Sequence, residues 1–139
     1  MLDEFLDSNV LVYAFTTDVR ASRAQQLLER GCLINVQILN EFANVARRKL
    51  RMSWMELTEA LEDIRTLCPT IASVTIDTHS AGLERAQRYG LSVFDGLVVA
   101  AALEAGCATL WSEDMHHGLV IDERLKILNP FIEDDPGSP

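Results

Sequence analysis

One segment, residues 92–103, indicates most about how this chain folds: Ser92-Val93-Phe94-Asp95-Gly96-Leu97-Val98-Val99-Ala100-Ala101-Ala102-Leu103. Residues 97–103 are apolar on every side of the predicted helix, which is typical of a helix buried between other elements. Ser92 and Asp95 have the spacing of a capping box at its start, and Gly106 follows its end. We therefore expect a helix from Ser92 to Ala105 that packs deep in the domain against a sheet.

Segments with the periodicity of strands and of helices alternate on both sides of this buried helix. The predicted strands are a segment ending near Asp7 and residues 33–38, 71–76, 108–111, 119–121 and 127–128. The other predicted helices are residues 21–30, 40–51, 53–67 and 78–89, of which the third opens with the capping box Ser53-Trp54-Met55-Glu56. This alternation predicts a single α/β domain with a mostly parallel central sheet, flanked by helices on both faces.

The length and composition are those of one globular domain. The chain has 139 residues, of which 48% are hydrophobic and 24% charged, so its apolar surface is sufficient for a core. This composition excludes a disordered chain. We expect the domain to extend over residues 1–132 and residues 133–139, Glu-Asp-Asp-Pro-Gly-Ser-Pro, to form a disordered C-terminal tail.

Three features predict a cytoplasmic protein that does not enter a membrane. Cys32, Cys68 and Cys107 are scattered among apolar residues, as buried thiols of a reducing compartment are. Residues 1–7 are acidic where a signal peptide would be basic. No apolar run approaches the ~20 residues that a membrane-spanning helix requires.

The formal net charge of −9 argues against binding of nucleic acid through overall positive charge. It leaves room for a local basic patch. Arg47, Arg48, Lys49 and Arg51 fall together on the helix predicted for residues 40–51. They are candidates for contacts with RNA phosphates, and a solvated, salt-bridged helix face is the alternative.

Four acidic residues lie at the ends of predicted elements. Asp7 follows the first strand, Glu41 lies in the first turn of a helix, Asp95 begins the buried helix, and Asp114 follows the strand at 108–111. In a parallel α/β sheet, ligand sites lie beyond the carboxyl ends of the strands, where these acids could meet. Each also has an ordinary interpretation, as a turn residue, an acid at a helix N-terminus or a solvated loop acid.

Carboxylates that converge in this way would repel one another unless a cation joined them. Two such charges about 4 Å apart cost on the order of 4 kcal/mol at an effective dielectric constant near 20. Because no cluster of Cys or His accompanies the acids, oxygen ligands alone indicate Mg²⁺ or Mn²⁺ rather than Zn²⁺. The residues are therefore consistent with an acid-rich metal site and phosphoryl chemistry, provided that the four acids converge.

The segments around these acids resemble the motifs of PIN domains, over about residues 3–132. Phe5-Leu6-Asp7-Ser8-Asn9-Val10-Leu11-Val12-Tyr13 is similar to the opening strand of that family, and Asn40-Glu41-Phe42 to its second acidic position. The segment from Ser92 to Ala102 is similar to the third position, and Leu110-Trp111-Ser112-Glu113-Asp114-Met115 to the fourth. Ile127-Leu128-Asn129-Pro130-Phe131 resembles the C-terminal strand of one bacterial branch. Any one motif is weak, whereas four in this order and spacing are specific.

The resemblance implies a single-strand endoribonuclease that depends on one or two Mg²⁺ or Mn²⁺ ions. Small bacterial members of the family are most often VapC-type toxins of type II toxin–antitoxin pairs. Carried over residue by residue, the resemblance implies that Asp7, Glu41, Asp95 and Asp114 bind the metal, with Ser112, Asn9 and Ser8 as polar partners of the acids. The partners it implies are an RNA substrate, such as tRNA or another structured RNA, a cognate antitoxin and a second copy of the chain in a homodimer.

The segment after Asp114 departs from the family pattern. Many members carry a further Asp two positions later and then an aromatic residue, where this chain has His116 and His117. A fifth acidic ligand is therefore missing at that place. We expect the two histidines to lie in a polar loop.

Two other classes of protein compete with a nuclease. A non-catalytic PIN-like interaction module could use Trp54, Met55, Leu57 and Leu61 as a groove or dimer contact, although core positions are the simpler expectation. The presence of all four acids argues against such a module. A phosphoacceptor receiver domain would need an acid pair after its first strand and a late Lys on a strand. Here Asp3 and Glu4 come before the strand, and Lys126 lacks that setting.

Overall fold

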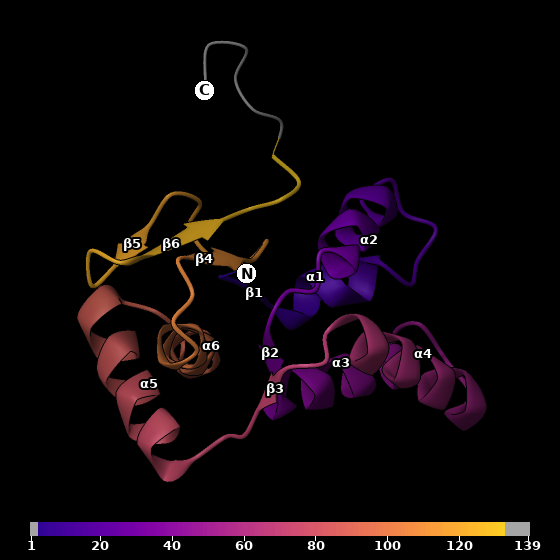
Figure 1. Ribbon diagram of the computed structural model, residues 1–139, viewed down its shortest axis with the longest axis horizontal. Coiled ribbons are helices and arrows are strands. Elements are labelled where there is room, and N and C mark those ends of the chain that lie inside the picture. Colours follow the sequence, from indigo (N-terminus) through magenta and orange to yellow (C-terminus); the bar gives the residue numbers. More distant parts are fainter. Residues whose placement is uncertain (1–2, 133–139) are drawn as a thin grey trace.

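Twelve short elements build the described part of the chain, and Figure 1 shows their arrangement. The computed structural model describes residues 3–132 of the chain. The strands are β1 (Glu4–Leu6), β2 (Ile34–Asn35), β3 (Ile71–Ala72), β4 (Thr109–Trp111), β5 (Val120–Ile121) and β6 (Leu125–Leu128). The helices are α1 (Ser8–Tyr13), α2 (Ala21–Glu29), α3 (Val36–Arg48), α4 (Trp54–Leu67), α5 (Ile76–Tyr89) and α6 (Val93–Glu104).

The strands form a mostly parallel sheet, as the alternation of elements predicts. Its order is β1-β4-β6-β5, in which β1 and β6 run parallel to β4 and only β5 is antiparallel. The parallel pair β2–β3 extends this sheet through a bridge between Phe5 and Leu33. Two backbone hydrogen bonds hold that bridge, from Leu6 N to the Leu33 oxygen at 3.1 Å and from Leu33 N to the Glu4 oxygen at 2.8 Å.

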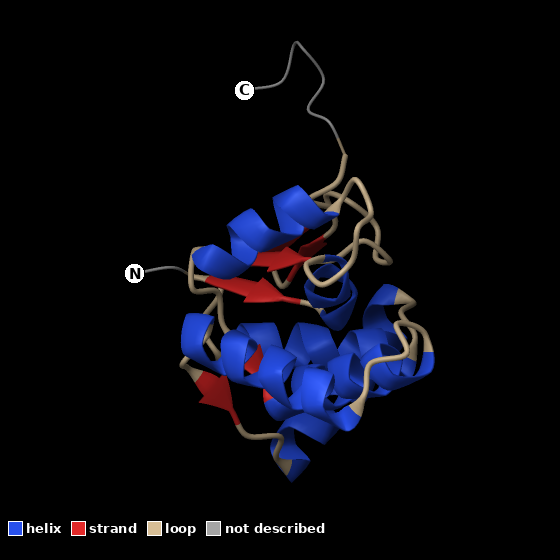
Figure 2. Cartoon of the chain, turned by 90° about the vertical axis from the view of Figure 1, so that its right-hand side faces the viewer, coloured by secondary structure: helices blue, strands red, loops and turns tan. Residues whose placement is uncertain are grey.

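Helices cover the sheet on both faces, which confirms the predicted architecture. Figure 1 shows α5 and α6 on one side of the strands and α1 to α4 on the other, and Figure 2 shows the same layers from the right-hand side. The apolar helix α6 is the buried helix that the sequence predicts, with its residues from Val98 to Leu103 all buried. Helix α6 packs against α5 at Gly82 and Gly96, where neither residue leaves room for a side chain.

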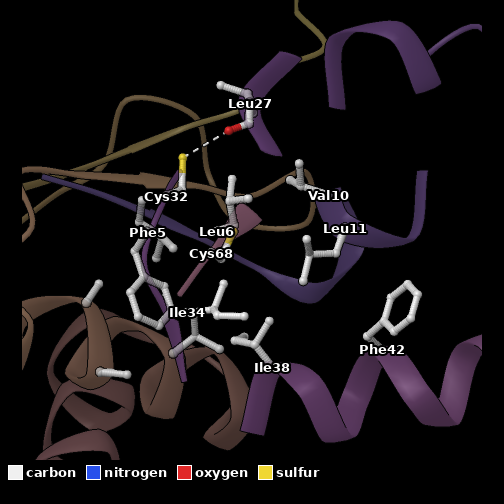
Figure 3. Close-up of a cluster of buried hydrophobic side chains, with 14 of the residues drawn as sticks. Phe5, Leu6, Val10, Leu11, Leu27, Cys32, Ile34, Ile38, Phe42 and Cys68 are labelled. Carbon is white, nitrogen blue, oxygen red and sulfur yellow. Dashed lines mark hydrogen bonds between the residues drawn. The ribbon is translucent and has the colours of Figure 1, made fainter. Parts of the chain in front are cut away.

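One part of the hydrophobic core lies between β1 and the helices α1 to α3. Figure 3 shows Phe5 and Leu6 of β1 near Ile34 of β2 and Ile38 of α3, with Phe42 farther along the same helix. All five side chains are fully buried. Burying side chains of this kind contributes roughly 1.5–3 kcal/mol each, so this packing fixes where β1 ends relative to α3. The three cysteines are buried and free, as the sequence predicts.

Three boundaries predicted from the sequence are wrong. The strand expected over residues 33–38 ends at Asn35, because the Asn35 side chain accepts a hydrogen bond from Ile38 N at 3.0 Å and starts α3 at Val36. Glu41 consequently lies in the second turn of α3 rather than in its first. The strand expected over residues 71–76 is likewise cut to β3, because Thr75 caps α5. The C-terminal tail expected over residues 133–139 lies outside the described residues.

No helix in the part of the chain that the structure describes is long and apolar enough to cross a membrane. The longest helices, α4 and α5, have 14 residues each and carry several charged side chains. A span of the hydrocarbon layer needs ~20 apolar residues.

Candidate functional site

Asp7 is the most firmly positioned acid of the site, because hydrogen bonds hold both its backbone and its carboxylate. Its backbone N–H donates to the Trp111 oxygen at 3.0 Å, which places it at the end of β1 beside the end of β4. Its Oδ1 accepts from Ser8 N at 2.7 Å, so the carboxylate caps α1. Its Oδ2 accepts from the buried Ser112 Oγ at 2.8 Å. The carboxylate therefore stays at the carboxyl edge of the sheet.

Burial makes Asp7 an unusually weak acid. The residue is only 4% exposed, and the loss of solvation raises its pKa from 3.8 to about 6. The hydrogen bonds from Ser112 and Ser8 lower the pKa, and the negative charges of Glu41 and Asp95 raise it further. The influence of Glu41 and Asp95 means that three acidic side chains from separate elements face the same region.

Glu41 reaches this region from α3. Its Oε2 accepts from Ser8 Oγ at 2.9 Å, and its Oε1 accepts from Gln37 Nε2 at 3.1 Å. Ser8 thus donates to Asp7 through its backbone and to Glu41 through its side chain. The shift of Glu41 into the second turn of α3 gives Gln37 a place on the same helix face, one turn earlier. Gln37 is absent from the predicted site, although its i, i+4 spacing to Glu41 is visible in the sequence.

Asn9 connects Asp7 to Asp114 on the other side. Its Nδ2 lies 3.3 Å from Asp7 Oδ2, 3.2 Å from Asp114 Oδ2 and 3.4 Å from Ser112 Oγ. Its Oδ1 accepts from Glu113 N at 3.1 Å, which holds the loop after β4 against α1. The structure therefore brings together Asp7, Asp114 and the three polar residues that the resemblance implies as their partners.

Asp95 begins α6 and completes the acidic group. Ser92 caps the helix by accepting from Asp95 N at 3.1 Å, but the reciprocal bond of a capping box, from Ser92 N to the Asp95 carboxylate, is not formed. The capping-box prediction is therefore wrong for the carboxylate. Burial raises the pKa of Asp95, the hydrogen bond with Ser92 lowers it, and the charges of Asp114 and Glu41 raise it. The side chain is half-buried, and the effect of these charges means that it lies within electrostatic range of Asp114 and Glu41.

The donor set of this site suits a hard divalent cation. All four acids provide oxygen atoms, and in the structure hydroxyl and amide hydrogens from Ser8, Asn9 and Ser112 occupy part of their lone pairs. Within residues 3–132, no three side chains of His, Cys, Asp or Glu already surround one point closely enough to hold a metal ion. The charges of Glu41 and Asp95 raise the pKa of Asp7, and those of Asp114 and Glu41 raise the pKa of Asp95, so the carboxylates share one region. Coordination of one ion would require these side chains to move closer together.

The next acid along the loop, Glu113, faces away from this group. Tyr13 donates its hydroxyl to Glu113 Oε1 at 2.8 Å, and Arg20 Nε lies 3.1 Å from Glu113 Oε2. Arg20 also stacks over the Tyr13 ring, 5.0 Å from its centroid. This arrangement neutralises Glu113 and leaves Asp114 as the acid of the loop that points toward Asn9.

The predicted basic patch divides into residues with different surroundings. Arg47 lies 4.1 Å from the centroid of the Trp54 ring and donates to the Met52 oxygen at 2.7 Å, so it fastens the loop between α3 and α4. Arg48 and Arg51 are exposed. Lys49 alone among the four lines a cleft that also contains Asp114.

The remaining predicted residues lie at the surface or in the core. His116 and His117 are exposed, and His117 Nδ1 accepts from Asn129 N at 2.9 Å, as a loop residue would. On α4, Leu57 is buried and Leu61 half-buried, as expected of core positions. Trp54 and Met55 are about 70% exposed, so the prediction that they belong to the core is wrong. They lie in the first turn of α4.

Comparison with known proteins agrees with this fold. The sequence pattern of the PIN domain matches residues 5–119. A chain of a toxin–antitoxin complex from Klebsiella pneumoniae is similar in fold, with a TM-score of 0.70 and 17% identity over 92% of this chain and 98% of that one. VapC20 of Mycobacterium tuberculosis, described as a toxin that cleaves the sarcin–ricin loop, gives a TM-score of 0.63 and 18% identity over 77% and 86%. A chain of VapBC2 from Rickettsia felis, solved with a promoter DNA fragment, gives 0.61 and 19% over 93% and 98%. A search of curated protein sequences gave no match.

Proposed function

The chain belongs to the PIN domain family, and from this premise we propose that it is a metal-dependent endoribonuclease of single-stranded RNA. The observation that carries the proposal is the linkage of Asp7, buried at the end of β1, to Glu41 through Ser8 and to Asp114 through Asn9. Carboxylates gathered in this way repel one another and destabilise the fold. A bound divalent cation would offset this repulsion.

In this proposal Asp7, Glu41, Asp95 and Asp114 hold one or two Mg²⁺ or Mn²⁺ ions. When bound, such an ion orients and activates a water molecule for in-line attack on the scissile phosphate, and offsets the charge that develops on the leaving oxygen. The products would carry a 3′-hydroxyl and a 5′-phosphate. The acids and their partners supply position and charge, and no His or Cys takes part.

The polar side chains around the acids set their orientation. Ser112 and Asn9 donate to the same oxygen of Asp7, which keeps its carboxylate turned toward the loop after β4. Ser8 turns Glu41 toward Asp7. Below about pH 6, Asp7 retains a proton on its buried carboxyl group. Asp7 must lose this proton before it can act as a ligand, so metal affinity should fall as the pH decreases.

We further propose that the enzyme is the toxin of a type II toxin–antitoxin pair and acts in the cytoplasm on a structured RNA such as tRNA. The support is the fold shared with chains of a toxin–antitoxin complex and of VapBC2. In this proposal a cognate antitoxin covers the acidic site, and two copies of the chain form a homodimer. Co-expression with the neighbouring reading frame, followed by size-exclusion chromatography with light scattering, tests both assemblies.

Cleavage of a panel of structured RNAs tests the enzymatic proposal. We expect the full chain to cut single-stranded regions with Mn²⁺ or Mg²⁺ and to be inactive in EDTA. Asp7→Asn should lower the rate by about 100-fold or more while the circular dichroism spectrum is retained, because a ligand and its charge are lost. The matched control is Asp63→Asn, which removes an exposed acid on α4 and should leave the rate unchanged. Full activity of Asp7→Asn in Mn²⁺ would refute the assignment.

Calorimetry distinguishes this enzyme from a non-catalytic interaction module. A nuclease of this design should bind Mn²⁺ with measurable heat, and that heat should be lost in Asp7→Asn. If the protein is instead a module without a metal site, neither the wild type nor Asp7→Asn should give heat with Mn²⁺.

A further inference from the structure

A cleft of about 410 Å³ opens directly beside the acidic group, between α1 and the C-terminal end of α3. Its volume falls within the range of small-ligand sites, which is roughly 300–1,000 Å³. Ser8, Asn9 and Asp114 belong both to this cleft and to the acidic group. If one phosphate of a polymer lies among the acids, the adjacent unit of that polymer would therefore lie in the cleft.

The walls of the cleft combine an apolar surface with polar groups at its edge. Val12 of α1, together with Val45 and Leu50 at the end of α3, provides half-buried aliphatic side chains. Ser8 and Asn9 provide a hydroxyl and an amide at the end that adjoins Asp114. An apolar surface with a few polar groups at its edge suits a nucleobase that stays attached to a sugar and phosphate.

The charges of the cleft favour an anion near Lys49. Lys49 lies in the wall, is exposed, and takes part in none of the ion pairs found among residues 3–132. Glu113, the second acid of the wall, is already engaged by Tyr13 and Arg20. The cleft thus carries one cation, Lys49, that is paired with no acid among residues 3–132.

We propose that this cleft binds one nucleotide of a single-stranded RNA, next to the scissile phosphate, with its base on Val12, Val45 and Leu50 and its phosphate on Lys49. The inference rests on the proposed ribonuclease function and deepens it by giving the substrate a subsite. It assigns Lys49 to the substrate, and it leaves Arg47 as a structural residue held by Trp54.

The contribution of Lys49 is measured through the salt dependence of binding. Fluorescein-labelled single-stranded RNA is titrated with the full chain in EDTA, where no cleavage takes place, and anisotropy is recorded at several KCl concentrations. Loss of one phosphate contact should reduce the slope of log K against log [salt] by about 0.7 in Lys49→Ala, and Lys49→Arg should restore it. Lys126→Ala is the matched control, since Lys126 is exposed on β6 and is the other lysine of the chain. Equal slopes for the two alanine variants would overturn the assignment of Lys49.

The place of the base is tested by filling the cleft. Val45→Trp should weaken binding of the intact oligonucleotide about tenfold, because the indole occupies the space of the base. A series of oligonucleotides is then compared, each with one abasic site at a different position along the strand. When the abasic site falls in the cleft, the wild type and Val45→Trp should bind the oligonucleotide equally. Val120→Trp, an exposed substitution on β5, is the control for surface hydrophobicity. Unchanged binding by Val45→Trp, with a native circular dichroism spectrum, would overturn the proposal.

Kinetics separate a failure of this inference from a failure of the proposed function. In Mn²⁺, Lys49→Ala should raise KM with little change in kcat, because the contact is outside the bond-breaking step. If the wild type cuts no RNA in Mn²⁺, the ribonuclease proposal fails, and the binding experiments in EDTA still decide whether the cleft holds RNA. If the wild type cuts RNA and the variants of Lys49 and Val45 bind as it does, only the subsite is wrong.

Discussion

At the scale of a single residue, Asp7 lies where its charge opposes folding. Its pKa rises from 3.8 to about 6 because the carboxylate is buried, and Glu41 and Asp95 add repulsion. A group whose pKa is raised in the folded state contributes stability below its unfolded pKa, and this contribution is lost as the pH rises through the folded value. The metal-free protein should therefore lose stability between about pH 4 and pH 6 from this residue.

Asp7→Asn should consequently stabilise the metal-free protein at pH 7, since the amide resembles the protonated carboxyl group. The shift in pKa corresponds to a gain in the free energy of unfolding of up to about 3 kcal/mol. Urea unfolding in EDTA at pH 7 and at pH 4 measures it, and the difference between variant and wild type should almost vanish at the lower pH. A variant less stable than the wild type at pH 7 would contradict the role of charge burial.

At the scale of elements, the contact between α5 and α6 sets the position of Asp95. A Cβ atom on Gly96 would collide with the Gly82 carbonyl oxygen, and one on Gly82 would come within 2.6 Å of a Leu97 methyl group. The two helices therefore approach more closely than any residue with a side chain permits. Because Asp95 immediately precedes Gly96 in the first turn of α6, the position of its carboxylate depends on the close contact between the two helices.

Gly96→Ala should lower the free energy of unfolding by about 2–3 kcal/mol, as overpacking of a buried contact does. It should also weaken Mn²⁺ binding, because α6 must move and carries Asp95 with it. Denaturant unfolding and calorimetry measure the two effects. The control is Gly90→Ala, in open space at φ 66°, which should cost about 1–2 kcal/mol of backbone strain and leave the metal heat unchanged.

The hairpin between β5 and β6 contains a strained residue. Asp122 and Glu123 both have positive φ, at 52° and 55°, and Arg124 N donates to the Ile121 oxygen at 3.0 Å. Turns of this geometry favour Asp-Gly, so the Asp suits its place and the Glu does not. Asp122 is also fixed to α5 by Arg85 at 2.6 Å and by Tyr89 at 2.9 Å.

Glu123→Gly should therefore raise the free energy of unfolding by about 1 kcal/mol, because it relieves the left-handed conformation. Thermal unfolding followed by circular dichroism measures the change. Asp122→Gly is the informative counterpart: it meets the same backbone requirement but loses the bonds to Arg85 and Tyr89, and should be destabilised. Equal effects of the two substitutions would show that the turn geometry alone matters.

At the scale of the whole molecule, the metal should act as a stabilising ligand. Binding to the folded state alone at 100 times the dissociation constant adds about 2.7 kcal/mol to the free energy of unfolding. For a domain of this length, Tm should rise by roughly 10 °C in saturating Mn²⁺. The rise should be reversed by EDTA and should diminish as the pH falls through 6, where Asp7 takes up a proton. An equal rise in Asp7→Asn would place the metal elsewhere.

The whole molecule also explains how a protein of net charge −9 could bind RNA. Four of the acids are gathered where a cation would offset them, and Glu113 is neutralised by Arg20. The cleft that adjoins the acids contains the free cation of Lys49. Attraction of RNA would therefore be local, and binding should be weak when metal is absent.

The sequence by itself determined the α/β class, the buried helix α6 and the presence of acids at the ends of elements. These follow from short-range patterns: the period of the apolar residues, the caps at Ser53 and Ser92, and the glycines after helices. The start of α3 at Val36 was predicted wrongly, because a short apolar run fits a strand or a buried helix equally well. The exposure of Trp54 was also predicted wrongly.

Only the tertiary structure decided whether the acids meet. Asp7 and Asp114 are 107 positions apart along the chain, and their link through Asn9 exists because β1 pairs with β4 in parallel. The orientation of Glu113 toward Arg20 and the cleft beside Lys49 depend in the same way on long-range packing. Local pattern fixes which residues end an element. The direction in which their side chains point is fixed by the elements that pack against them.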